Sequence, residues 1–219
     1  MRVILLGTTG MVGQAALRAC LQDPDVTEVL SIGRHSSSQR DAKLRELVVP
    51  DLFDLSSIDA QLSGYDACLY CLGVSSAGMS EVSYRHITYD LTLSIAQRLL
   101  ARSPSLTFIY VTGSGTDTRG SAMWARVKGD TEQALLALGF KAAYMFRPAF
   151  IQPQHGVRSR TWWYHAIYRL TAPIYPLLAR TKLAAYMTTS DQLGHAFISV
   201  AKRGAPKSIL EPPDINAIT

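Results

Sequence analysis

Two side chains in the stretch SAMWARVKGD, residues 121–130, have the spacing of a shared binding site. Trp124 precedes Lys128 by four residues, and residues four apart on an α-helix lie on the same face. The indole N–H can donate a hydrogen bond to a carbonyl but does not ionise in water, so it cannot deliver its proton. Three interpretations are open at this point: an acid–lysine pair with an unusual member, a site that has lost its acid, or two unrelated helix residues.

A glycine-rich stretch near the start of the chain has the spacing of a phosphate-binding loop. In LLGTTGMVG, Gly7, Gly10 and Gly13 form the pattern G-x-x-G-x-x-G between an apolar run and a helical pattern. Glycine lets the backbone turn tightly and approach a pyrophosphate, and the helix N-terminus offers free N–H groups and positive potential. We therefore predict a dinucleotide site that also includes Thr9, Met11 and Val12. The alternative is an ordinary turn with close helix packing.

The segment SIGRHSSS, which ends the second predicted strand, bears on the choice of cofactor. NAD-specific sites usually place an acidic residue here to hold the ribose 2′-hydroxyl, whereas this chain has Arg34. An arginine suits a 2′-phosphate through charge-assisted hydrogen bonds. We therefore expect NADP in preference to NAD. A solvated surface arginine is the other interpretation.

Two further segments are expected to line the cofactor. Asp51 could accept a hydrogen bond from the adenine amino group, although a turn or cap role is equally open. CLGVSSAG would run beside the adenosine ribose and pyrophosphate. Cys68 and Cys71 form C-x-x-C inside an apolar strand, which favours buried structural cysteines over a redox pair. The predicted contacts here are Asp51, Leu52, Cys71, Leu72 and Gly73, and no metal site is predicted.

These residues need a scaffold that brings successive strand ends together, and the pattern of the chain predicts one. Apolar runs alternate with segments of helical period, which implies right-handed crossovers and a parallel sheet covered on both faces. Ligands bind beyond the carboxyl ends of such strands. We expect a doubly wound Rossmann core over residues 1–151 and a small, mostly helical substrate-side cap over 152–219, within one globular unit. The expected strands are 2–6, 27–33, 44–49, 66–73, 106–113 and 141–146, and the expected helices are 11–22, 56–62, 81–102, 122–138 and 188–203.

Six short motifs over residues 1–151 together resemble a known family. They are GTTGMVG, GR after the second strand, CLG, YVTGSGTD, VKGDTE and FRPAFI. In order and spacing they are similar to the short-chain dehydrogenase/reductase superfamily in its atypical branch, near the Tat-interacting-protein-like and epimerase/dehydratase-related small proteins. The resemblance implies a catalytic serine at Ser114, contact of Lys128 with the nicotinamide ribose, and backbone contact of Arg147 and Pro148 near the nicotinamide. It also implies a tyrosine four residues before the lysine, where this chain has Trp124.

The missing tyrosine matters because in the family it moves the proton while hydride is transferred. A phenol has a pKa near 10 that a neighbouring ammonium can lower, and losing a general acid costs roughly 10²- to 10⁴-fold in rate. Other groups could take over, although each could equally pack or cap. The candidates are Tyr84, Tyr89, His86, Tyr164, Tyr168 and His165.

Two functional hypotheses follow. The first is an NADP-dependent oxidoreductase of low or unusual activity on a small apolar carbonyl or quinone-like substrate. The second is an NADP-binding regulatory or scaffold protein without turnover. A sugar-nucleotide epimerase is a third and weaker idea, because about 65 residues after the core are few for gripping a nucleotide sugar.

The composition narrows the remaining choices. Apolar residues make up 47% and charged residues 18% of the 219 residues, which suits a packed core and argues against disorder. The net charge of +5 is spread along the chain, too weak a signal for a nucleic-acid partner. Three cysteines form no even disulfide framework, and no cleavable signal pattern begins the chain, so we expect a reducing cytoplasm.

A basic aromatic segment, residues 158–182, mixes arginines with tryptophans and tyrosines. We expect it to act as a lid or to pack on the core, with a homodimer face as the second interpretation and a membrane-surface helix as the least favoured. Its apolar content indicates an apolar or aromatic substrate.

Overall fold

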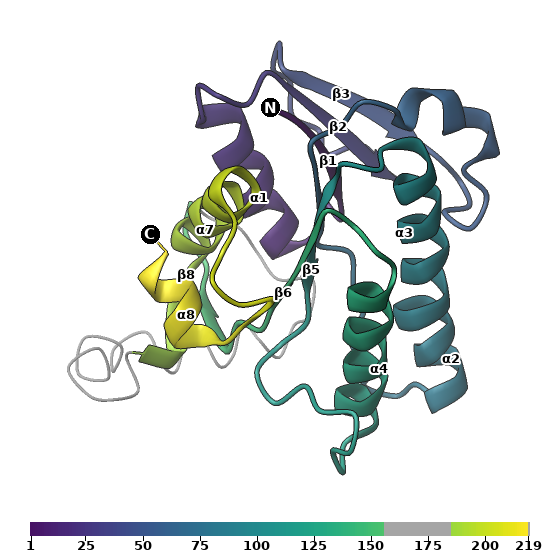
Figure 1. The fold of residues 1–219 in the computed structure, drawn as a ribbon, viewed down its shortest axis with the longest axis vertical. Helices are drawn as coiled ribbons and strands as arrows, with labels where there is room; N and C mark the ends of the chain where they lie inside the picture. The colour runs from purple at the N-terminus through teal and green to yellow at the C-terminus, as the bar shows by residue number, and fades with distance from the viewer. Residues whose placement is uncertain (156–184, 219) are drawn as a thin grey trace.

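A parallel sheet forms the centre of the molecule in the computed structural model, which describes residues 1–155 and 185–218. Its strand order is β3-β2-β1-β4-β5-β6-β9, and all of its adjacent strands pair in parallel. The predicted doubly wound fold is therefore confirmed (Figure 1). The strands are β1 Arg2–Leu6, β2 Glu28–Gly33, β3 Leu44–Val48, β4 Ala67–Tyr70, β5 Thr107–Val111, β6 Ala142–Phe146 and β9 Ile209–Leu210.

The central strands form because their residues are apolar on both sides. All four residues of β4 are buried, and so are four of the five in β1. A strand covered by helices on both faces reads as a continuous apolar run instead of an alternating one. This is why short runs such as RVILL and ACLY could be assigned from sequence.

Helices cover the two faces of the sheet in separate layers (Figure 1). One layer holds α1 Met11–Gln22 and α7 Ser190–Arg203. A β-carbon added at Gly194 of α7 would lie 2.8 Å from the carbonyl oxygen of Ala15, so these two helices approach closely. The other layer holds α2 Glu81–Arg85, η2 His86–Asp90, α3 Leu91–Arg102 and α4 Met123–Ala137, with the 3₁₀ helix η1 Ser56–Leu62 beside α3.

The long helix expected over residues 81–102 is present, but it is not α-helical throughout. Residues His86–Asp90 form a π-helical turn between α2 and α3. Such a turn accommodates extra backbone within a continuous helix, and the spacing of apolar residues did not predict it. Ser80 caps the beginning, its hydroxyl oxygen accepting a hydrogen bond from the backbone N–H of Ser83.

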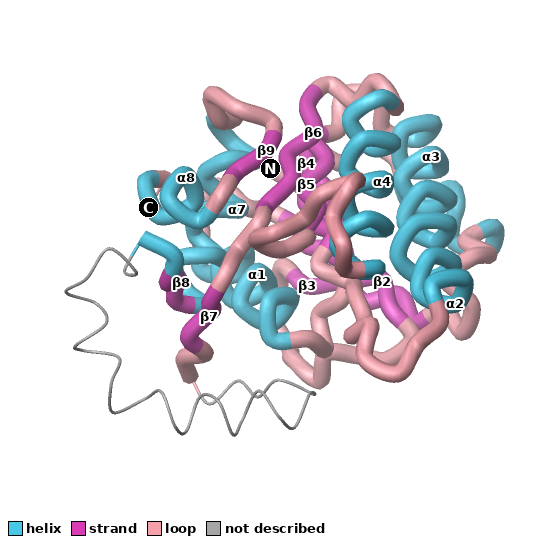
Figure 2. Tube along the Cα trace, turned by 90° about the horizontal axis from the view of Figure 1, so that it is seen from below, coloured by secondary structure: helices cyan, strands magenta, loops and turns pink. Residues whose placement is uncertain are grey.

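The chain after residue 150 contributes to both the sheet and its helical cover. β7 Phe150–Gln152 and β8 Met187–Thr189 pair in parallel beside the main sheet (Figure 2). The predicted capped helix is confirmed as α7, which Thr189 begins in a capping box with Gln192. Strand β9 and helix α8 Pro212–Ala217 follow, and at two and six residues they were too short for the sequence pattern to predict.

Two expectations concern residues that the structure does not describe. The basic aromatic segment 158–182 lies outside the described residues, as do Tyr164, His165 and Tyr168. The described helices include none with the length and apolar character needed to cross a membrane. The boundary predicted at residue 151 stays a prediction.

Candidate functional site

The glycine loop joins β1 to α1 in the shape that its sequence predicts. Gly7 has a φ of +88°, and its carbonyl oxygen accepts a hydrogen bond of 2.9 Å from the N–H of Gly10. A β-carbon at Gly7 would lie 2.6 Å from the backbone of Cys71, and one at Gly13 would lie 2.1 Å from the carbonyl oxygen of Gly7. These two glycines are therefore required by close backbone packing, whatever the ligand. Gly10 is different, because its β-carbon would meet that oxygen only at 3.4 Å.

The beginning of α1 is suited to an anion. Gly10 is the N-cap and provides no side-chain cap, and the first turn contains no acidic residue. The first N–H groups of the helix thus keep their positive potential for a ligand. Thr9, Met11 and Val12 are half-buried around this point, as the predicted site requires.

Arg34 follows β2 and is exposed. Its guanidinium forms no hydrogen bond or ion pair with another residue of the described ranges, so it is free to meet a ligand. The loop after it is fixed by Glu46 on β3, whose carboxylate accepts from the Ser36 hydroxyl at 2.6 Å and from the Ser37 N–H at 2.7 Å. Burial opposes ionisation of Glu46, but these hydrogen bonds outweigh it and lower the pKa of the carboxyl. No local pattern pointed to Glu46, which becomes a neighbour of the serines only when β3 pairs with β2.

The residues expected near the adenosine differ in what they can offer. The Asp51 carboxylate accepts from the N–H of Phe53 at 2.9 Å, which is the turn role left open by the sequence. The Leu52 side chain is 4% exposed and belongs to the core, so it cannot face a ligand. Cys71 and Leu72 lie directly against Gly7, and Gly73 is exposed beyond them.

The three cysteines are free thiols. Cys20 and Cys68 are buried and Cys71 is half-buried. Burial raises the pKa of all three thiols, to about 12 for Cys20. A thiol that stays protonated is a poor nucleophile, so the structural role predicted for Cys68 and Cys71 fits their surroundings.

The end of β5 brings together the three residues that the family resemblance singled out. The N–H of Ser114 donates to the carbonyl oxygen of Pro148 at 3.0 Å, and the ammonium of Lys128 donates to the carbonyl oxygen of Thr112 at 2.7 Å. A β-carbon at Gly115 would lie 3.6 Å from Cη2 of Trp124. The indole therefore packs beside Gly115, the residue that follows Ser114. Trp124 and Lys128 thus both contact the short segment 112–115.

Lys128 is a poorly solvated ammonium. Desolvation lowers its pKa from 10.5 to about 8, while the negative charge of Glu132 opposes the change. At neutral pH the side chain still carries its proton and can donate to hydroxyl or phosphate oxygens.

Arg147 makes contacts that the sequence did not predict. Its guanidinium forms two hydrogen bonds with the Glu132 carboxylate, of 2.5 and 3.0 Å, and a third of 2.9 Å with Glu211. These carboxylates raise the pKa of the already basic guanidinium still further. Only the backbone of Arg147 and Pro148 is thus left to approach a cofactor. Glu132 lies within VKGDTE, but its partners come from strands distant in sequence.

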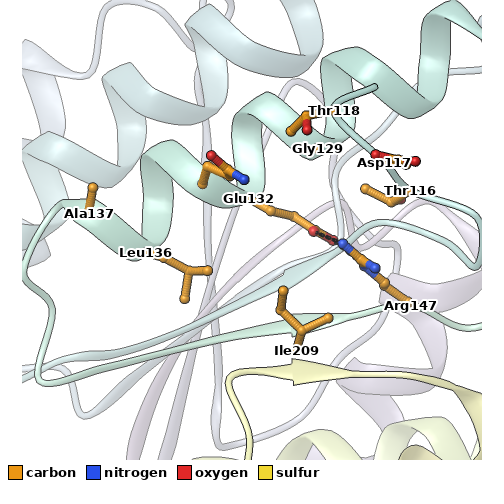
Figure 3. Close-up of a pocket in the computed structure, with 10 residues that line it drawn as sticks. Thr116, Asp117, Thr118, Gly129, Glu132, Leu136, Ala137, Arg147 and Ile209 are labelled. Atoms are coloured by element: carbon orange, nitrogen blue, oxygen red, sulfur yellow. Dashed lines mark hydrogen bonds and ion pairs between the residues drawn. The ribbon is translucent and has the colours of Figure 1, made fainter. Parts of the chain in front are cut away.

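An open pocket of about 710 Å³ lies along α4, beside this ion pair. Its walls come from the loop after β5, from α4 and from Ile209 of β9. Figure 3 shows Glu132 and Arg147 pointing toward one another within it. None of the predicted adenosine or pyrophosphate contacts lines this pocket.

The candidate replacements for the missing tyrosine have other partners. Tyr84 is 1% exposed, and burial raises the pKa of its phenol. The ring of Tyr89 lies 4.3 Å from the guanidinium carbon of Arg85. His86 stacks on Phe53 and its Nδ1 lies 3.2 Å from the carboxylate of Asp90. Tyr84 is thus held in the core as a very weak acid, and Tyr89 and His86 are engaged in packing.

Sequence comparisons relate the chain to known proteins. Residues 3–122 match the family model described as "NAD dependent epimerase/dehydratase family", and the match ends just before Trp124. The chain is 30% identical over 159 residues to "Protein fmp52, mitochondrial" of Emericella nidulans, covering 69% of this chain and 67% of that protein. It is 30% identical over 142 residues to "Leucinostatins biosynthesis cluster protein T" of Purpureocillium lilacinum, covering 63% of this chain and 52% of the relative.

Solved structures support the fold. A short chain dehydrogenase/reductase from Saccharomyces cerevisiae superposes with a TM-score of 0.68 at 13% identity, covering 100% of this chain and 98% of the other. The Bordetella bronchiseptica enzyme WbmH, solved in complex with NAD+, gives a TM-score of 0.68 at 14% identity, covering 96% of this chain and 74% of that chain. The fold that the resemblance to short-chain dehydrogenases/reductases implies is therefore confirmed, and the family-model match over residues 3–122 confirms the resemblance itself.

The names of the relatives also correct one expectation. Several of them are called mitochondrial, which contradicts the predicted cytoplasmic location. Free cysteines indicate a reducing environment, but they do not distinguish one reducing compartment from another.

Proposed function

Because this chain belongs to the NAD dependent epimerase/dehydratase family, we propose that it binds NADP(H) and acts as an oxidoreductase of low or unusual activity. The family binds nicotinamide cofactors. The observation that carries the proposal is the arrangement at the end of β5, where Lys128 is tied to Thr112 and Trp124 packs beside Gly115. Ser114 and Lys128 offer a hydroxyl and an ammonium at this point, and Trp124 offers an indole at the position where the family resemblance implies a phenol.

The preference for NADP is supported by the loop after β2. Arg34 extends from a segment that Glu46 holds through Ser36 and Ser37. A guanidinium on a loop that is already fixed can bind a 2′-phosphate without the entropy cost of ordering the loop, and this raises the affinity. The short stretch after β2 contains no acidic residue that would hold a 2′-hydroxyl instead.

The roles of the residues follow from their chemistry. When bound, NADPH supplies a hydride to a carbonyl carbon. Ser114 orients the carbonyl oxygen, Lys128 holds the ribose hydroxyls of the cofactor, and Trp124 donates a hydrogen bond that polarises the carbonyl without giving up its proton. The proton that the carbonyl oxygen needs to become the alcohol hydroxyl must therefore come from water or from another group, which accounts for the low rate that we propose.

The substrate class that we propose is a small apolar carbonyl or quinone. It rests on the aromatic composition of residues 158–182. A small-molecule partner, with no nucleic acid, fits the modest and dispersed positive charge. A homodimer remains a prediction.

A second function is favoured by a specific observation. Trp124 is packed against the serine loop in the place of the family's proton donor. We therefore also consider an NADP-binding protein without turnover, in which binding itself is the function.

One experiment separates these possibilities. The affinities for NADPH and NADH are measured by titration calorimetry, and NADPH oxidation is then followed with a panel of apolar aldehydes, ketones and quinones. Binding with substrate-dependent oxidation supports the oxidoreductase, and binding without oxidation across the panel supports the second function. Failure to bind either cofactor would reject both.

A further inference from the structure

We propose that Glu132 is a positioning residue for the nicotinamide end of the cofactor site. By this inference it fixes both the Thr112 peptide that holds Lys128 and the Arg147–Pro148 turn that holds Ser114. The inference deepens the proposed function and rests on it for the identity of the ligand. It concerns a residue that the family comparison does not reach, because the matched segment ends at residue 122.

Glu132 is a carboxylate in the interior of the protein. The residue is 1% exposed, and Arg147 forms an ion pair with it at 2.5 Å. A buried charge is costly unless it is paired and hydrogen-bonded. Although Glu132 borders the open pocket, almost none of its surface meets solvent, so its effects are exerted mainly on the groups that surround it.

The first of these groups is Thr112, at the end of β5. The hydroxyl of Thr112 donates to Glu132 at 2.6 Å, and its N–H donates to the carbonyl oxygen of Phe146 at 2.8 Å. Its own carbonyl oxygen accepts the hydrogen bond from Lys128. The peptide that receives the lysine is thus held on one side by β6 and on the other by Glu132.

The second connection runs through Arg147. Two hydrogen bonds to Glu132 fix the guanidinium, and the next residue, Pro148, accepts the hydrogen bond from the N–H of Ser114. Three segments that would meet the nicotinamide end therefore share Glu132: the helix with Lys128, the loop with Ser114, and the turn after β6.

The charge of Glu132 also acts on Lys128, one helical turn before it. Its negative potential opposes the desolvation that lowers the lysine pKa. Two other charged neighbours are paired with partners of their own, Glu81 with Arg126 and Asp130 with Arg85. The titratable and charged groups on the elements packed against α4 are Glu81, Tyr84 and Arg85 on α2, His86, Tyr89 and Asp90 on η2, Arg98 and Arg102 on α3, Tyr110 on β5, and Tyr144 and Arg147 on or beside β6.

The test uses Glu132→Gln with Glu211→Gln as its matched control. Both changes remove one carboxylate partner of Arg147, but Glu211 is half-exposed and makes no contact with Thr112. NADPH affinity is measured from nucleotide fluorescence between pH 6 and 10. We expect affinity to fall above about pH 8 in the natural protein. In Glu132→Gln the fall should begin about one pH unit lower, since an opposite charge has been removed.

Glu211→Gln should keep the pH profile of the natural protein, and its NADPH affinity should stay within about twofold. If the loss of one carboxylate partner of Arg147 were the whole cause, both variants would change alike. Equal profiles for Glu132→Gln and the natural protein would overturn the proposal. If Glu132→Gln does not fold, Thr112→Val decides, since it removes the hydroxyl that donates to Glu132 at 2.6 Å and lies 3.2 Å from the Phe146 carbonyl oxygen, and it leaves the backbone contacts of Thr112 in place. It should weaken NADPH binding at least about threefold, and unchanged binding would overturn the proposal.

A second readout separates this inference from the proposed function. The pKa of the Lys128 amine can be followed without cofactor, by competitive acetylation at varied pH and mass spectrometry of the peptide. If the protein binds no NADPH, the proposed function fails, and the acetylation profile still tests Glu132. A lower lysine pKa in Glu132→Gln supports its action on Lys128, and an unchanged one rejects it.

Discussion

The ammonium of Lys128 donates a 2.7 Å hydrogen bond to the carbonyl oxygen of Thr112. This contact ties helix α4 to the end of strand β5, at the sheet edge where a doubly wound fold places its ligand. It also holds the ammonium close to the segment 112–114, so that Lys128 and Ser114 can contact the same ligand.

Replacing Lys128 with Met should weaken NADPH binding roughly 10- to 100-fold, because a charge-assisted hydrogen bond is lost. Stability should not fall in parallel. The pKa of Lys128 in the folded protein is about 8, below the ordinary 10.5. At pH 7 the folded protein therefore carries a poorly solvated ammonium, which lowers its stability. This loss of stability disappears as pH rises from 8 to 10.5, because the folded protein releases the proton before the unfolded chain does. Calorimetric titration and thermal unfolding at pH 7 check both points. Unchanged affinity would contradict the assignment.

Replacing Arg34 with Ala should raise the Kd for NADPH roughly 10-fold or more and leave the Kd for NADH unchanged, because only NADPH carries the 2′-phosphate. Arg40→Ala is the matched control, since Arg40 is an exposed arginine of the same loop. Comparable affinities for NADPH and NADH in the natural protein would refute the preference for NADP.

Replacing Trp124 with Tyr should increase substrate-dependent NADPH oxidation, by up to roughly 10²- to 10⁴-fold, because a phenol beside Lys128 can deliver its proton. Trp124→Phe keeps an aromatic ring without an ionisable group and serves as the control. Steady-state rates with the most active carbonyl of the panel provide the measurement. Identical rates for the two variants would show that the proton comes from elsewhere.

The glycine loop separates packing from ligand contact. Gly13→Ala should destabilise the protein severely, because its β-carbon would lie 2.1 Å from the oxygen of Gly7. Gly10→Ala should fold, since that distance is 3.4 Å, yet lose NADPH affinity if the loop faces a pyrophosphate. Thermal unfolding and titration distinguish the outcomes, and normal binding by Gly10→Ala would favour the packing interpretation alone.

Alkaline pH should destabilise the fold. Burial raises the pKa of Cys20 from 9.0 to about 12 and raises those of Tyr70 and Tyr110 above their ordinary 10.0. The unfolded chain therefore releases these protons first, and stability is lost as pH rises above about 9. Lys128 has the opposite effect on stability, because its pKa is lowered in the folded protein, but it is a single group against three. Urea unfolding at pH 7.5 and 10 measures the difference, which Cys20→Ala should reduce.

Much of the fold could be predicted because local patterns determine it. Continuous apolar runs gave six strands, and helical periodicity gave α1, α4 and α7 close to their observed bounds. The π-helical turn at His86–Asp90 and the two-residue strand β9 were missed. Neither leaves a periodic signal, since one is a slight change of helical pitch and the other is formed only by pairing with β6.

For the site, short stretches of sequence were enough to predict which residue types lie at the carboxyl end of the sheet. Glycine spacing, Arg34, and a helix face with Trp124 and Lys128 can all be recognised locally, because each depends on a few neighbouring residues. The tertiary structure alone decided their partners. Glu46 reaches Ser36 across a strand pair, Asp51 is occupied by its own turn, and Glu132 meets Thr112 and Arg147 from three different elements. Such contacts depend on strand register and helix rotation, which no short stretch of sequence specifies.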